Sequence, residues 1–190
     1  MSKILMEIEI KVKIENPGPL KKLLEKEGTL KYTDRQVDEY YTPAHRNFVA
    51  KEPIEEWLRL RDSNGKYSIN YKRWHYDAEG KSDHCDEHET KIESIEMARE
   101  ILKALDCKPL ITVSKVRSAW DYKDYEVSFD EVEELGSFVE IEYTGDTSDV
   151  NPKEITTKMM EFLNNLGCGK IDRTFKGYPH QLLYKHGLLK

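Results

Sequence analysis

The chain has 190 residues, of which 35% are charged and 38% are hydrophobic, a balance that suits a folded protein rather than a disordered one. Its formal net charge of −6 argues against a broadly basic surface for nucleic acid, and no apolar run reaches the roughly 18 residues of a membrane helix. The cysteines Cys85, Cys107 and Cys168 lack paired metal spacing. We expect a single cytoplasmic domain over residues 1–190, with free thiols and with no nucleic-acid or membrane partner. A homodimer is compatible with these features.

The chain opens with ILMEIEIKVKI (4–14), whose strict alternation predicts a half-buried strand. Asn64-Gly65 marks a hairpin further along, and Ser94 and Asn151 are candidate helix N-caps. Short turns between successive strands favour an antiparallel sheet. We predict an α+β fold, an eight-stranded closed or nearly closed β-barrel with helices packed outside. The predicted strands are 4–14, 35–42, 55–62, 66–75, 83–93, 110–120, 123–132 and 137–144, and the predicted helices are 16–28, 94–105, 151–167 and 178–189.

Charged residues recur at spacing two on at least five of these strands. In the first strand Glu7, Glu9, Lys11 and Lys13 share one face. Like charges on one face repel, and an unpaired charge in a dry barrel costs several kcal/mol. The charged faces must therefore surround water, ions or a charged ligand, while the apolar faces turn outward against the helices. The charged set comprises the acids Glu7, Glu9, Glu87, Glu89, Asp130, Glu140 and Glu142 and the bases Lys11, Arg59, Arg61, Lys72, Lys115 and Arg117.

This combination of charges suits a metal-bound polyphosphate. Arginine and lysine bind phosphate oxygens, and clustered carboxylates suit a hard divalent cation such as Mg²⁺ or Mn²⁺. The sequence has no Walker-type glycine loop and no GxGxxG motif. Side chains, rather than a backbone loop, are therefore expected to hold the phosphates.

The motif EIEIK (7–11) resembles the ExExK signature of the CYTH superfamily, the triphosphate tunnel metalloenzymes. The likeness continues in order through LRLR, Lys72, EHE, KVR, Asp130 and FVEIEY, and covers about residues 4–145. VDEYYTPAHRNF (37–48) resembles the CyaB-like, class IV adenylyl cyclase branch. The chain departs from that branch at Arg73-Trp74, where Gly-Pro is usual, and at Cys85, where arginine is frequent.

The resemblance implies a role for each charged residue of the barrel. Mg²⁺ or Mn²⁺ would be held by Glu7, Glu9, Glu140 and Glu142, with Glu89 and Asp130 as weaker candidates. Lys115, Asp130 and Lys11 would be catalytic, and Arg46 would order the entrance loop. The direction of Lys176 is left open. The implied contacts to the triphosphate are Lys11, Arg59, Arg61, Lys72, Lys115 and Arg117.

Three functions follow from the resemblance. A cyclase converts ATP to cyclic AMP and pyrophosphate, and a triphosphatase hydrolyses thiamine triphosphate, inorganic tripolyphosphate or a nucleoside triphosphate. The third function is non-catalytic binding of polyphosphate or a nucleotide. The large carboxylate set favours an enzyme over a binding protein, and the CyaB-like segments favour the cyclase.

Other motifs carry less chemistry. His84, Cys85 and His88 suggest zinc, but on a strand Cys85 faces away from both histidines. We predict that His180 and His186 are surface residues. We interpret Trp57, Trp74 and Trp120 as core or rim packing rather than as a base-stacking platform.

Overall fold

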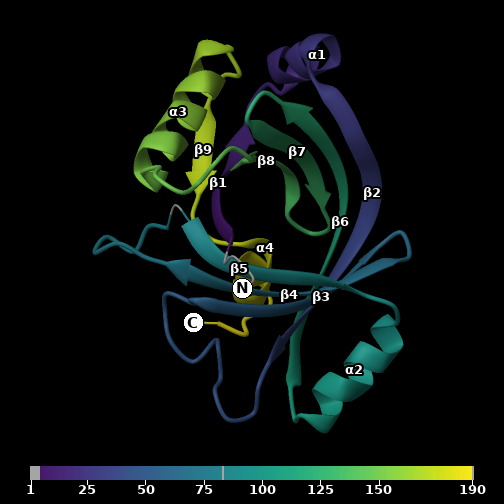
Figure 1. The fold of residues 1–190 in the computed structure, drawn as a ribbon. Coiled ribbons are helices and arrows are strands. Elements are labelled where there is room, and N and C mark those ends of the chain that lie inside the picture. Colours follow the sequence, from purple (N-terminus) through teal and green to yellow (C-terminus); the bar gives the residue numbers. More distant parts are fainter. Residues whose placement is uncertain (1–4, 83, 190) are drawn as a thin grey trace.

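The structure is a computed structural model that describes residues 5–82 and 84–189. Within these residues, nine strands form one antiparallel sheet, and pairing of β1 with β5 closes eight of them into a barrel (Figure 1). The predicted α+β barrel is confirmed. The strands are β1 (Leu5–Ile14), β2 (Thr29–Thr42), β3 (Glu56–Ser63), β4 (Lys66–His75), β5 (His84–Ile92), β6 (Lys108–Tyr122), β7 (Tyr125–Val132), β8 (Gly136–Tyr143) and β9 (Ile171–Thr174).

β1 lies at the seam where the barrel closes. Along one edge, its residues 9–12 pair with β8, in a register that sets Glu9 opposite Glu142 and Lys11 opposite Glu140. Along the other edge, residues 5–8 pair with β5 and residues 11–14 pair with β9. β1 therefore has neighbours on both edges, and its charged residues have a fixed phase relative to those of β8.

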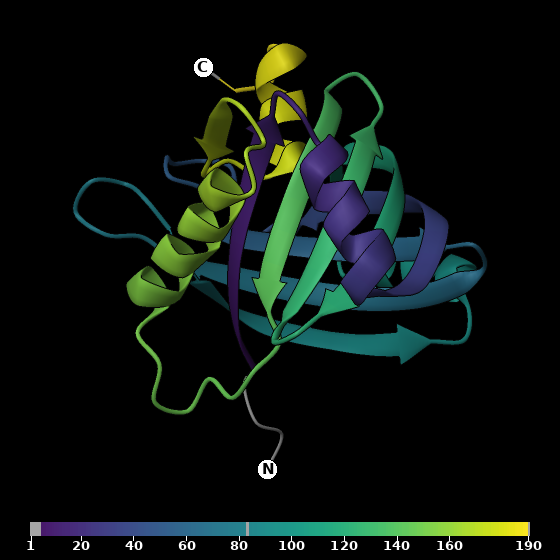
Figure 2. The same cartoon turned by 90° about the horizontal axis from the view of Figure 1, so that it is seen from above.

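Four helices surround the barrel in the part of the chain that the structure describes. Ser94 and Asn151 act as the predicted N-caps and accept the backbone N–H groups of Met97 (3.1 Å) and Lys153 (3.0 Å). α1 and α3 lie on the outer face near β1, β7 and β8 (Figure 2), and α2 lies on the other side of the barrel (Figure 1). The helices are α1 (Gly18–Glu27), α2 (Ile95–Ala104), α3 (Pro152–Asn165) and α4 (Tyr178–Lys185).

The apolar core lies between the barrel and its helices, as the inverted pattern of the strands predicts. Ile8, Ile10 and Val12 of β1 are buried against Leu24 of α1 and Met159 of α3. A second cluster of buried apolar residues packs α2 against β3. A third cluster includes the buried residues of α4. Fully burying each of these aliphatic side chains contributes roughly 1.5–3 kcal/mol. The hydrophobic energy is therefore gained outside the barrel, which leaves its interior to charged groups.

Two strand segments were not predicted from the sequence. β9 has four residues and pairs only with the end of β1, so it is too short to show a period. The first six residues of β2, from Thr29, lie before the predicted strand 35–42 and were not assigned to an element. They are mostly exposed and pair with β6 across an irregularity near Leu30, so one face is not distinctly apolar. Among the described residues, no helix is long and apolar enough to cross a membrane.

Candidate active site

The barrel surrounds a tunnel of about 250 Å³ with a highly charged wall. All six predicted bases and all five predicted metal-binding glutamates line it. Lys13 does not; it is exposed, and its Nζ donates to the backbone oxygen of Leu135 (3.1 Å). Because alternate residues of a strand face the same side, the strands bring together the acids Glu7, Glu9, Asp38, Glu87, Glu89, Glu126, Glu140 and Glu142 and the bases Lys11, Arg59, Arg61, Lys72, Lys115 and Arg117.

Two of the four glutamates on β1 and β8 already have cationic partners. Glu140 accepts from Lys11 (2.8 Å) and from Arg117. Although burial opposes ionisation, Arg117 and Lys11 hold the pKa of Glu140 well below its ordinary value. Glu7 accepts from Lys72, and the Cys85 thiol donates to the same carboxylate (3.0 Å). These carboxylates are therefore matched by charge within the protein.

Glu9 and Glu142 are different, because they lie opposite each other on adjacent strands and, among the described residues, no cation lies within 3.5 Å of either carboxylate. The Lys11 ammonium is 3.9 Å from the Glu9 carboxylate and is bonded more closely to Glu140. Burial, together with Glu7 and Glu140, raises the pKa of Glu9 to about 7. Burial and Glu7 raise the pKa of Glu142 to about 8. This corner of the tunnel holds more negative charge than the protein neutralises.

The donor set at Glu9 and Glu142 fits a divalent cation. Among the described residues, no three acidic, histidine or cysteine side chains already converge as a metal centre. Mg²⁺ does not require such a group, because it is commonly bound by one or two carboxylates together with substrate phosphates and waters. Glu9 and Glu142 provide two oxygen donors with excess negative charge, and Glu7 and Glu140 lie beside them. The pair fits Mg²⁺ or Mn²⁺ bound together with a polyphosphate.

Without metal or phosphate, the protein is expected to lose stability as pH rises from about 5 to 7. The folded-state pKa values of Glu9 and Glu142 lie above the ordinary value of 4.5, so the fold favours their protonated forms and is destabilised when they ionise. We expect a loss of about 2 kcal/mol in the free energy of unfolding. Urea denaturation in EDTA at a series of pH values measures it.

The loss of stability with rising pH ends near pH 7, because the deprotonation of another group then stabilises the fold. Burial and Arg117 lower the pKa of Lys115 to about 7, so its deprotonation in the folded state adds stability as pH rises further. Added Mg²⁺ should stabilise the protein more at pH 8 than at pH 6, since it replaces protons at Glu9 and Glu142. A stability that is flat or rising between pH 5 and 7 in EDTA would contradict the charge excess.

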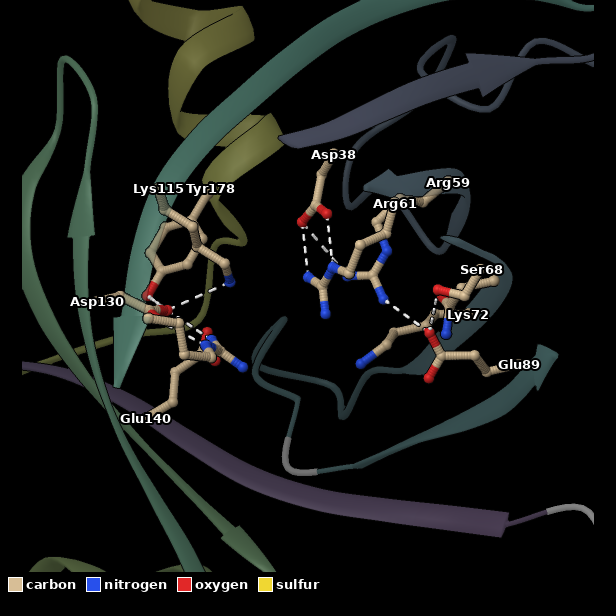
Figure 3. A network of polar contacts seen from close by, with 12 residues as sticks. Asp38, Arg59, Arg61, Ser68, Lys72, Glu89, Lys115, Asp130, Glu140 and Tyr178 are labelled. Atoms are coloured by element: carbon tan, nitrogen blue, oxygen red, sulfur yellow. Dashed lines mark hydrogen bonds and ion pairs between the residues drawn. The ribbon is translucent and has the colours of Figure 1, made fainter. Parts of the chain in front are cut away.

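A second cluster lies on β2 and β3, where Asp38 holds two arginines. Arg61 donates to Asp38 through a two-bond fork, with Nε–Oδ1 and Nη2–Oδ2 distances of 2.6 and 2.7 Å. Arg59 approaches the same carboxylate at 3.6 Å and Glu89 at 3.7 Å (Figure 3). Burial disfavours the Asp38 charge, but Arg61 and Arg59 lower its pKa. Asp38 thus orients two of the predicted phosphate-binding side chains.

The third cluster joins β6, β7 and α4. Asp130 accepts from Arg117 (Nε–Oδ1 2.7 Å), Lys115 (3.3 Å) and the Tyr178 hydroxyl (2.9 Å) (Figure 3). The Lys11 ammonium lies 4.3 Å from the centre of the Tyr178 ring. Tyr178 therefore brings the start of α4 against the tunnel wall. The sequence predicted this helix but did not indicate its direction.

Asp130 itself is fully buried and does not line the tunnel. The sequence suggested a catalytic role for it, but its oxygens are occupied by three donors. Its position suits orientation of Lys115 and Arg117 rather than contact with a substrate. Tyr178 and Asp38 were not predicted as site residues. Asp38 had a signal, because it is in phase with Tyr40 on a predicted strand.

The other candidate residues are placed as follows. His180 was predicted at the surface, which is wrong: it is 5% exposed, and its Nε2 lies 2.7 Å from Glu52. The ring is covered because α4 packs against the β2–β3 loop through it. Lys176 lines two cavities beside the tunnel rather than the tunnel wall. Arg46 pairs with Glu56 at 3.0 Å, which ties the loop after β2 to β3.

The zinc interpretation of residues 84–88 gains no support from the geometry. Cys85 is buried and contacts Glu7, whereas His88 is exposed and stacks on Tyr71 at a ring distance of 6.1 Å. Trp57 and Trp74 line the tunnel, and Trp120 packs against the core beside α1 and α3. The chemistry of the tunnel is therefore that of carboxylates, arginines and lysines.

The fold and the tunnel together define a closed β-barrel protein built to hold a highly charged ligand. The CYTH domain family model matches residues 5–178. The chain belongs to the CYTH domain family, which confirms the resemblance seen in its motifs.

Related proteins match along nearly the whole chain. "Putative adenylate cyclase MJ0240" of Methanocaldococcus jannaschii is 35% identical over 92% of this chain and 97% of its own length. The PH1819 protein of Pyrococcus horikoshii has a similar structure, with a TM-score of 0.76 and 29% identity over 94% of this chain and 99% of that one. A Hippeastrum structure described as "putative adenylyl cyclase HpAC1", with a dominant triphosphatase activity, has a TM-score of 0.61 at 20% identity, covering 95% and 96% of the two chains.

Proposed function

We propose that this protein is a metal-dependent enzyme that acts on a triphosphate in its tunnel, and that it converts ATP to cyclic AMP and pyrophosphate. The observation that carries the proposal is the charge distribution of the wall. Six cationic side chains surround a space that also contains the unneutralised pair Glu9 and Glu142. Phosphate binding alone needs the cations but not this carboxylate pair, so the combination favours catalysis with a metal ion.

The roles of the side chains follow from their positions. Arg59 and Arg61, held by Asp38, provide planar donors for phosphate oxygens. Lys11 lies on β1 and Lys72 lies on β4, the strand that pairs with β3, and both side chains line the same tunnel. A divalent cation held by Glu9 and Glu142 would add positive charge where the phosphoryl oxygens and leaving pyrophosphate need it. These charges are in place before reaction, which is the main requirement of phosphoryl transfer.

The region beside the tunnel supports a substrate that carries an organic group. Trp57 and Trp74 line both the tunnel and an adjoining cavity of about 410 Å³, which Tyr76 and Phe175 also line. Aromatic surfaces of this kind suit a base or another ring, whereas inorganic tripolyphosphate needs only the charged part. The MJ0240 name is consistent with an adenylyl cyclase.

In the cyclase reaction, the ribose 3′-hydroxyl gives up its proton to solvent water and its oxygen attacks the α-phosphorus. The bond from the α-phosphorus to the oxygen that bridges to the β-phosphate breaks, and pyrophosphate leaves with that oxygen. Arg59, Arg61 and Lys72 would hold the departing phosphates, and Lys115 would contact the α-phosphate. The lowered pKa of Lys115, about 7, means that it is partly neutral near pH 7 before substrate binds. Phosphate charge beside it favours protonation, so it would become a full cation in the complex.

A triphosphatase is the second candidate, because the same wall can direct water at the γ-phosphorus. The description of the Hippeastrum protein, whose fold this chain shares, supports a triphosphatase as the second candidate function. The two reactions need the same cations and differ in which phosphorus of the triphosphate is attacked. They are distinguished by their products.

The test incubates the protein with ATP, thiamine triphosphate or tripolyphosphate in Mg²⁺ or Mn²⁺ and identifies the products by mass. We expect cyclic AMP and pyrophosphate from ATP. ADP or thiamine diphosphate with orthophosphate, and no cyclic product, would favour the triphosphatase. Tight binding of all three without turnover would leave a binding protein. Glu9→Gln protein, purified in parallel, controls for contaminating phosphatases.

A further inference from the structure

The two ends of the tunnel differ in the side chains that line them. At one end, which we call the α4 end, the inward-facing positions of the strands become apolar, and Tyr40 and Trp57 share a buried cluster with Tyr178 of α4. Figure 2 shows α4 beside this end of the barrel, where β1 ends. At the opposite end the lining side chains include Glu126 and Tyr32. Tyr32 precedes Tyr40 on β2 by roughly 26 Å of strand.

The α4 end of the tunnel leads into the adjoining cavity of about 410 Å³, which we call the side cavity. Trp57, Trp74 and Gly177 line both spaces, so the tunnel and the side cavity meet beside them. Residues 174–177, which join β9 to α4, form another part of the side-cavity wall. Its volume lies in the range of about 300–1,000 Å³ that is typical of small-molecule sites. The side cavity is therefore large enough for the organic part of a substrate whose phosphates lie in the tunnel.

The cations of the tunnel have a fixed order from the α4 end. On β3, Trp57 comes before Arg61 as the strand runs away from this end. On β6, Lys115 comes before Arg117, and the Lys115 ammonium lies 5.1 Å from the centre of the Tyr178 ring. Lys115 therefore lies closer to the α4 end, whereas Arg61 and Arg117 lie further along the tunnel. A triphosphate whose organic group occupies the side cavity would place its α-phosphate near Lys115, as the proposed cyclase reaction requires.

We propose that the tunnel binds its substrate in one direction, with an aromatic ring of the substrate stacked on Trp74 in the side cavity and the phosphate chain running toward Arg61 and Arg117. The inference rests on the proposed function, in that the ligand is a triphosphate. Phosphates match the tunnel, where the cations converge, and a ring matches the side cavity, where aromatic side chains converge. The opposite direction would place the ring beside Tyr32 and the α-phosphate far from Lys115.

Calorimetric titration with ATP and with tripolyphosphate in EDTA tests the direction of binding without requiring turnover. Trp74→Ala should weaken ATP binding by about tenfold, because the base loses its stacking surface, and should change tripolyphosphate binding by less than about twofold. Trp74→Phe keeps an aromatic ring and should bind ATP within about threefold of the parent. Tyr32→Ala is the matched control, since Tyr32 is also a half-buried aromatic residue of the tunnel wall. Its affinity for ATP should remain that of the parent.

The pattern across the two ligands separates the possible outcomes. Unchanged tripolyphosphate binding by Trp74→Ala shows that the tunnel is intact, so a selective loss of ATP binding supports the proposal. An equal loss of both ligands, no loss of ATP binding, or a parent protein that does not bind ATP would overturn it. A selective loss of ATP binding in Tyr32→Ala would establish the opposite direction. If Trp74→Ala shows the selective loss but ATP yields no cyclic AMP in the product assay, the cyclase function fails and the direction of binding stands.

Discussion

Replacing Glu9 or Glu142 by glutamine is expected to reduce turnover by roughly 10²–10³-fold while making the metal-free protein more stable. Glutamine keeps the size of the side chain but binds a hard cation poorly. The loss corresponds to about 3–4 kcal/mol of transition-state stabilisation. The metal-free protein becomes more stable because each glutamate is buried beside other carboxylates, which raises its pKa to about 7 or 8. At pH 8 we expect about 1–3 kcal/mol of added stability in EDTA.

Turnover at limiting Mg²⁺ and urea denaturation in EDTA measure the two effects. Glu161→Gln is the matched control, because Glu161 is exposed on α3, and it should change neither quantity. A loss of turnover together with a gain in stability is informative, since a variant that merely misfolds loses both activity and stability. Activity within a few-fold of the parent in both tunnel variants would exclude the metal assignment. Lower stability at pH 8 would exclude the charge excess.

The architecture could be predicted because the strands alternate strictly. In β1 the residues Ile8, Ile10 and Val12 are apolar and alternate with Glu7, Glu9 and Lys11, so a period of two assigns every side chain to a face. Charges of this kind on several strands cannot surround a dry interior. A charged tunnel with an outward-facing core could therefore be predicted without structural information. β9 could not be predicted, since its four residues become a strand only beside β1.

The distribution of charge within the tunnel could not be predicted. All four glutamates of β1 and β8 are equivalent in the sequence, but the register sets Lys11 opposite Glu140 and Glu9 opposite Glu142. Within residues 5–82 and 84–189, the second pair has no cation as close as the one that Lys11 gives Glu140. A different register would neutralise different residues, because pairing depends on which side chains meet across the strands. The sequence thus indicates the four candidate metal ligands, and the register of β1 and β8 shows which of them are neutralised by a cation.

Asp38 illustrates a signal that was present but incomplete. It shares its strand face with Gln36 and Tyr40, and a lone acid on a strand usually faces water. Its role is visible only when β2 pairs with β3, because the register places Asp38 opposite Arg61. Asp38 contacts two arginines only because β2 pairs with β3 in the barrel, and β2 alone does not show this contact.

Asp38→Asn is expected to lower the free energy of unfolding by about 3–5 kcal/mol without ligand. Asp38 is 1% exposed, and loss of its carboxylate leaves the buried Arg59 and the half-buried Arg61 without their shared counter-charge. Removing one partner of a buried ion pair has this order of cost. Urea denaturation at pH 7 measures it. Asp149→Asn, at an exposed position, is the control and should change stability by less than about 0.5 kcal/mol.

Tripolyphosphate should then stabilise Asp38→Asn more than it stabilises the parent. In the parent, Asp38 occupies the fork of Arg61, so a phosphate must compete with it. In the variant, the phosphate supplies the missing negative charge and binds arginines that have lost the carboxylate they shared. The increase in melting temperature with tripolyphosphate should therefore be larger in the variant, although turnover should fall because the guanidinium groups are no longer oriented. A smaller increase than in the parent would show that Arg59 and Arg61 do not contact the phosphates.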